Sequence, residues 1–105
     1  MQKFGLQRNS SSLPNAIELE LAKEKATSLG RAGMKLELSL ERYNELMKEQ
    51  PSNSEEHRQI QEISANVWEL LVQREFIGFI EGNLQWVKEN YAIPAKAIDL
   101  LEHTG

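Results

Sequence analysis

Apolar and small residues recur at alternating steps of three and four between residues 19 and 47 of this chain. An α-helix turns once every 3.6 residues, so residues at these steps lie along one side of a single long helix. Such a side is the contact surface of coiled coils and helical bundles, and it needs a packing partner along its whole length. The residues of this seam are Leu19, Ala22, Ala26, Leu29, Gly33, Leu36, Leu40, Tyr43 and Met47. The spacing therefore predicts an all-α protein.

The length of the chain, 105 residues, is that of a single domain. A polar stretch that ends at Ser12 predicts that residues 1–13 form a flexible N-terminal arm. Phe4 and Leu6 are the apolar residues of this arm that we expect to dock on another surface. Residues 14–105 then make up one helical domain.

The first helix is predicted to run from about residue 15 to residue 49. Asn15 precedes Glu18 by three residues, and an asparagine in this position can cap a helix by accepting a backbone hydrogen bond. Ser12 is the alternative cap, because Pro14 would suit the first turn of a helix.

A proline and a capping signal separate the first helix from the second. Pro51 ends the first helix, and Ser52 with Glu55 three residues later forms a capping-box pattern. So short a connection forces the second helix to return antiparallel to the first. The second helix is predicted at about 53–90, and a short third helix at about 94–102.

The middle of the second predicted helix is apolar on nearly all sides between residues 67 and 80. A helix of this kind is buried on more than one side, and the first helix alone cannot cover it. We expect the short third helix to cover part of it and a second subunit to cover the remainder, and two hairpins with two-fold symmetry would form a four-helix bundle as a homodimer. The candidate interface residues are Trp68, Leu71, Val72, Phe76, Phe79 and Ile80.

Two charged residues, Arg74 and Glu75, interrupt this apolar region. In a hairpin that turns at residue 51, Arg74 should lie near Gly30 and Gly33 of the first helix. Each glycine costs about 1 kcal/mol relative to alanine inside a helix, so we expect another element to pack closely against them. Arg74, Glu75 and Arg31 are the candidate polar network. They either line a polar pocket or form a structural ion-pair network, since buried charges are rarely left unpaired.

Composition argues against several classes of site. The chain has no cysteine, which excludes disulfides and thiolate metal sites. Neither His57 nor His103 has a glutamate three residues before it, so the Glu-x-x-His motif of di-metal bundles is absent and we expect no metal and no cofactor. The net charge is −4 with no basic stripe, which argues against nucleic-acid binding. No apolar run approaches the roughly 18 residues of a membrane span, so we expect a soluble, cytoplasmic protein.

Three short segments resemble a family of short, uncharacterised, all-helical bacterial proteins. They are Leu-Gly-Arg-Ala-Gly at 29–33, Val-Gln-Arg-Glu at 72–75 and Tyr-Ala-Ile-Pro at 91–94. The resemblance implies a helical fold and draws attention to Arg74 and Glu75. It implies no activity and no catalytic residue.

No catalytic constellation is visible in the sequence. Ser10, Ser11 and Ser12 form a hydroxyl cluster, but no histidine or lysine is placed to activate them. We therefore expect a protein that is not an enzyme and that acts as a homo-oligomeric interaction or scaffold protein. The alternatives are a small regulatory protein that binds another protein, and, with less support, a regulator that binds nucleic acid.

Overall fold

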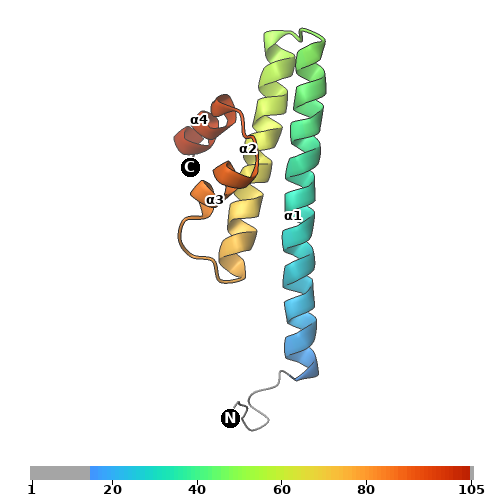
Figure 1. Ribbon diagram of the computed structural model, residues 1–105, viewed down its shortest axis with the longest axis vertical. Coiled ribbons are helices and arrows are strands. Elements are labelled where there is room, and N and C mark those ends of the chain that lie inside the picture. Colours follow the sequence, from blue (N-terminus) through green and yellow to red (C-terminus); the bar gives the residue numbers. More distant parts are fainter. Residues whose placement is uncertain (1–14, 105) are drawn as a thin grey trace.

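The computed structural model describes residues 15–104, which form four helices and no strand. The helices are α1 (Ala16–Lys48), α2 (Asn53–Phe76), α3 (Asn83–Asn90) and α4 (Ala95–Thr104). Helices α1 and α2 form a long antiparallel hairpin, and α3 and α4 lie beside α2 (Figure 1). The all-α fold and the hairpin are confirmed. The predicted arm at 1–13, with Phe4 and Leu6, and the alternative cap Ser12 lie outside the described residues.

Local capping signals set the ends of the hairpin. The backbone N–H of Glu18 donates to Oδ1 of Asn15 over 2.8 Å, which makes Asn15 the N-cap of α1. At the turn, the N–H of Glu55 donates to Oγ of Ser52, and the N–H of Ser52 donates to Oε1 of Glu55. Both predicted caps are therefore confirmed, because each satisfies N–H groups that a helix start leaves without intrahelical partners.

The predicted helix at 53–90 is wrong as a single element. Helix α2 ends at Phe76, and a loop leads to α3 at Asn83. The N–H of Phe79 donates to the carbonyl of Arg74, and the N–H of Gly78 donates to the carbonyl of Glu75. This pair of bonds is a Schellman motif, which requires a left-handed residue after the helix. Gly78 supplies it with a φ of +116°, so the chain leaves the helix although the apolar pattern continues.

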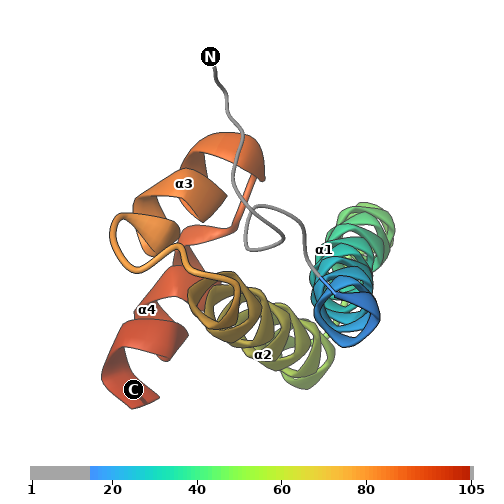
Figure 2. The same cartoon turned by 90° about the horizontal axis from the view of Figure 1, so that it is seen from below.

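Helix α2 is the centre of the fold. Helices α1, α3 and α4 each pack on it, with α1 on one side and α3 and α4 on the other (Figure 2). The buried apolar residues are Ala32, Leu36, Ile60, Ile63, Val67, Leu70, Val87, Ala97 and Leu101. Two short helices of the same chain therefore cover part of the α2 surface that α1 leaves open, where one short helix was expected.

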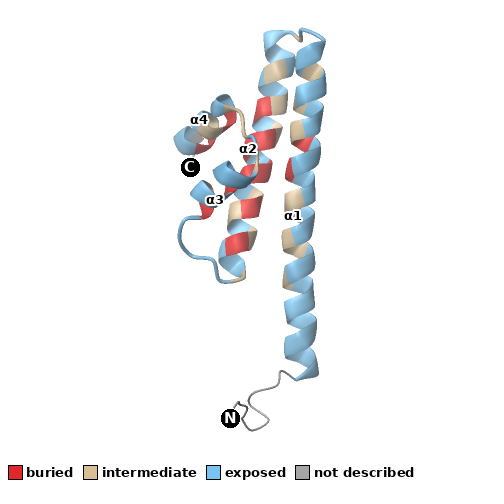
Figure 3. Ribbon diagram, viewed as in Figure 1, coloured by how far each residue is buried: buried red, intermediate tan, exposed pale blue. Residues whose placement is uncertain are grey.

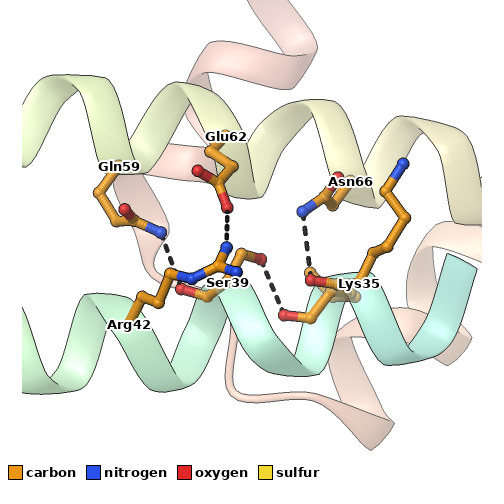
Figure 4. A network of polar contacts seen from close by, with 7 residues as sticks. Lys35, Ser39, Arg42, Gln59, Glu62 and Asn66 are labelled. Carbon is orange, nitrogen blue, oxygen red and sulfur yellow. Dashed lines mark hydrogen bonds and ion pairs between the residues drawn. The ribbon is translucent and has the colours of Figure 1, made fainter.

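The seam of α1 is turned slightly from its predicted position. The fully buried residues are Ala32, Leu36 and Ser39, whereas Met47 is exposed. Ser39 can be buried because its Oγ donates to the carbonyl of Leu36 over 2.8 Å. Its own carbonyl accepts a hydrogen bond from Nε2 of Gln59 over 3.0 Å (Figure 4). A satisfied polar residue thus occupies a position that an apolar pattern does not predict.

Polar contacts also run along one edge of the hairpin. Nδ2 of Asn66 donates to the carbonyl of Lys35, and the Lys35 ammonium forms an ion pair with Glu69. Arg42 forms an ion pair with Glu62 over 2.7 Å (Figure 4). These ion pairs are exposed, so each contributes little to stability, but together they favour one register of α1 against α2.

Helix α1 extends beyond the end of α2. At 1.5 Å per residue, its 33 residues span about 50 Å and the 24 residues of α2 about 36 Å. Residues 16–24 are all exposed (Figure 3). The radius of gyration is 18.7 Å, against about 13 Å for a compact domain of similar length. Among residues 15–104, no helix is both long and apolar enough to cross a membrane.

Candidate functional site

Arg74, in the last turn of α2, is the only buried charged side chain among residues 15–104, with 8% of its surface exposed. Its Nε donates to Oδ1 of Asn83 over 2.8 Å. Nδ2 of Asn83 in turn donates to the carbonyl of Phe79. Asn83, at the start of α3, therefore joins the end of α2 to the loop that follows it.

Two aromatic rings lie against the guanidinium group of Arg74. Its central carbon is 3.7 Å from the centre of the Trp86 ring and 4.5 Å from the centre of the Phe79 ring. Such cation–π contacts are favourable, more so where water is excluded. The Schellman motif explains the contact with Phe79, because the residue two positions after the C-cap commonly packs on the last helical turn.

Arg74 also lines a cavity of about 200 Å³ between α1 and the C-terminal helices. The lining residues from α1 are Leu29, Gly30, Gly33, Met34 and Glu37, and those from the rest of the chain are Leu70, Arg74, Trp86 and Tyr91. The prediction that Arg74 lies near the two glycines is confirmed. The proximity of Arg74 to each glycine follows from counting residues on either side of the turn at Pro51.

The predicted network of Arg74, Glu75 and Arg31 needs correction. Glu75 and Arg31 are exposed, and the side-chain contacts of Arg74 are with Asn83, Phe79 and Trp86. Adjacent residues on a helix point about 100° apart, so Arg74 and Glu75 cannot both face the cavity.

Tyr91 places a hydroxyl group at the same cavity. Its Oη would lie 3.2 Å from a Cβ atom built on Gly33, so the glycine leaves room for it. Burial raises the pKa of Tyr91, the charge of Glu37 raises it further, and Arg74 lowers it. The hydroxyl therefore keeps its proton at neutral pH and can donate a hydrogen bond.

Sequence reasoning missed Asn83 and did not assign Trp86 and Tyr91 to a site. The signal for Asn83 was the Gly82-Asn83 pair, which follows the Gly78 turn by four residues. Glycine and asparagine are typical of turns, and a break there would have placed a new helix start beside Arg74.

A second candidate region is an apolar surface at the open end of the hairpin, opposite the Pro51 turn. Of the predicted interface residues, Leu71 is half-buried beside the core, and the others are exposed, Phe76 by 65% and Ile80 by 78%. The Lys25 ammonium lies 5.1 Å from the centre of the Phe76 ring, so the end of α2 lies beside Lys25 of α1. The exposed large apolar residues near this end, on α1 and at the end of α2 and the loop after it, are together called the open-end surface: Ile17, Leu19, Leu21, Phe76, Phe79 and Ile80.

Within residues 15–104, no three histidine, aspartate or glutamate side chains are grouped so as to hold a metal ion. Comparison with models of protein families found no match for this chain. Comparisons with curated proteins and with solved structures likewise found no match.

Proposed function

We propose that this protein is a non-catalytic interaction protein that pairs with a second copy of itself through the open-end surface. The observation that carries the proposal is the overhang of α1. Ile17, Leu19 and Leu21 are each about half exposed or more, and no other described element packs on residues 16–24. Most of the stability of a helix in a protein comes from packing of its apolar side chains, so the unpacked apolar residues of this segment favour a partner.

The apolar area supports an interface of ordinary size. A standard interface takes about 800 Å² from each partner. Aromatic side chains bury 150–250 Å² each, so the exposed parts of Phe76 and Phe79 supply on the order of 200 Å². Ile17, Leu19, Leu21 and Ile80 add aliphatic area.

A second copy is the partner that this geometry favours. Closed two-fold pairs are the commonest assembly of soluble proteins. In an antiparallel pair, each overhang would lie beyond the end of the partner's α2, where a longer α2 would otherwise continue. Each copy would then cover apolar residues of the other, and the hairpins would join end to end.

Light scattering after size exclusion tests the proposal. At micromolar concentration we expect twice the chain mass of 12.0 kDa. Replacing Ile17 and Leu21 together by glutamate should give the monomer mass, because the new charges would be buried in the interface. The matched control is Leu38→Glu, which changes an apolar side chain that is similarly exposed but lies on α1 away from the open end. It should leave the dimer intact.

A dimer with a micromolar dissociation constant is almost fully formed at about 100 times that concentration. A monomer mass at every concentration up to that value would overturn the proposal. Dimerisation that survives the Ile17 and Leu21 change but is lost in Leu38→Glu would place the interface elsewhere and would also overturn it.

A further inference from the structure

We propose that the cavity around Arg74 is a binding site for a carboxylate group, which the guanidinium holds from inside the fold. The cavity is formed by residues of one chain, so this inference does not depend on the proposed dimer. Its basis is a buried guanidinium group that forms no ion pair within residues 15–104.

The charge of Arg74 is not neutralised by an ion pair. Within residues 15–104 four ion pairs form, and their cations are Lys35, Arg42, Lys48 and Lys96. Residues 1–14 contain no aspartate or glutamate, so no acidic side chain from that segment can supply the missing charge. A buried cation is costly unless it is paired, and an anion from another molecule would provide the pairing.

The hydrogen-bonding capacity of Arg74 is also mostly unused. A guanidinium has five N–H donors, and the one on Nε bonds to Asn83. Among the described residues, none accepts a hydrogen bond from the two terminal nitrogens. The rings of Trp86 and Phe79 contact the group but offer no oxygen acceptor. The four remaining donors are therefore available to a ligand in the cavity.

A carboxylate fits these donors. Arginine binds carboxylates through two parallel N–H···O bonds, which match the planar fork of the guanidinium. The hydroxyl of Tyr91 lines the same cavity and can donate a further bond. The volume of about 200 Å³ is below that of typical pockets for drug-sized ligands, and so suits a small acid or a single acidic side chain.

Glu37 is the rival occupant. It lines the cavity from α1 and is exposed, and no ion pair joins it to Arg74. Its negative charge should weaken the binding of any other anion. Replacing it by glutamine removes that charge with little change in shape, so Glu37→Gln should strengthen carboxylate binding if the ligand occupies this cavity.

The two tryptophans provide an internal control for the binding experiment. Trp86 lines the cavity and contacts Arg74, whereas Trp68 lies on the exposed surface of α2. Acetate is titrated into the ¹⁵N-labelled protein at constant ionic strength against chloride, and the two indole N–H signals are followed by NMR. We expect a saturable shift of the Trp86 signal with a dissociation constant on the order of 1 mM, and no saturable shift of Trp68.

Three variants make the result specific. Arg74→Lys keeps the charge but loses the planar fork, and should weaken binding at least about fivefold. Glu37→Gln should strengthen binding about threefold or more, as the removal of one nearby like charge predicts. Lys35→Met, which removes an exposed cation on α1, should bind acetate as the native protein does.

A second titration identifies the source of the carboxylate. The probe is the blocked peptide acetyl-Ala-Glu-Ala-amide, compared with its glutamine counterpart. Binding of acetate alone assigns the site to a free acid, and tighter binding of the glutamate peptide assigns it to an acidic side chain of another chain. The proposal is overturned if neither probe gives a saturable Trp86 shift in the native protein and in Glu37→Gln, or if Arg74→Lys, shown to be folded by its spectrum, binds as tightly as the native protein.

Discussion

The guanidinium carbon of Arg74 lies 3.7 Å from the centre of the Trp86 ring, and this contact joins the hairpin to the C-terminal helices. Arg74 lies in the last turn of α2, and Trp86 is in the first half of α3. Asn83, at the start of α3, adds a second contact between the two helices, because its Oδ1 accepts a hydrogen bond from Nε of Arg74. The position of α3 therefore depends on a charged residue that sits in an apolar part of the sequence.

The first prediction is that Arg74 is energetically coupled to Asn83 and not to Glu75. Asn83→Ala leaves the buried Nε–H without a partner and should cost about 1–3 kcal/mol of unfolding free energy. In a double-mutant cycle with Arg74→Met, the two changes should be non-additive by at least about 0.5 kcal/mol. Glu75→Gln alters an exposed side chain, should cost under about 0.5 kcal/mol, and should add to Arg74→Met. Denaturant unfolding measures the unfolding free energies of the three single and the two double variants.

The opposing result is that the substitutions at Arg74 and Glu75 are non-additive while those at Arg74 and Asn83 are additive. Arg74 and Glu75 would then share a network. The contact with Asn83 would then contribute nothing measurable to stability.

The second prediction separates the two glycines of α1. A Cβ atom at Gly30 would meet nothing within 4 Å, so Gly30→Ala should stabilise the protein by about 1 kcal/mol. A Cβ atom at Gly33 would lie 3.2 Å from Oη of Tyr91, which must then move. We therefore expect Gly33→Ala to be less stable than Gly30→Ala, and Gly33→Leu to be destabilising by about 1–3 kcal/mol through overpacking. Thermal melts in parallel would contradict this if both alanine variants gained equally.

The hairpin could be predicted from the sequence because its signals are local. Asn15, Pro51 and the Ser52–Glu55 box each act on their own helix end, and helix geometry then carries Arg74 to the level of Gly30 and Gly33. None of these steps requires knowledge of a distant contact.

The rest depends on tertiary contacts or on a single backbone angle. The apolar pattern continues through Phe79 and Ile80 in the loop, so periodicity hides the end of α2, which Gly78 decides through its positive φ. Burial of Ser39 depends on hydrogen bonds to Leu36 and from Gln59, which the pattern cannot show. The partners of Arg74 could not be predicted while residues 53–90 were taken as one helix, because α3 returns only after the break.

The third prediction concerns acid. Hydrogen bonds from the backbone and side chain of Ser52 lower the pKa of Glu55 below its ordinary value of 4.5, with Arg58 adding to the effect. A lowered pKa in the folded state contributes stability above pH 4.5 that is lost as pH falls through the folded pKa. Between about pH 5 and pH 3, the stability of the native protein should therefore fall more steeply than that of Glu55→Gln. Urea unfolding at several pH values measures both slopes, and parallel slopes would exclude a contribution from the charged capping box.

The last prediction concerns the titration of Tyr91. Burial is the main cause that raises its pKa above 10.0, Glu37 adds to the shift, and Arg74 opposes it. A raised pKa in the folded state means that the stabilising contribution is present below pH 10.0 and is lost as pH rises through the folded value. The chain has two tyrosines, so a Tyr43→Phe background leaves the phenolate absorbance of Tyr91 alone. In that background Arg74→Met should raise the Tyr91 pKa further and Glu37→Gln should lower it. Unchanged pKa values would mean that neither charge acts on the hydroxyl at the cavity, and shifts of the opposite sign would contradict the prediction outright. The expected signs would place Tyr91, Glu37 and Arg74 around one site.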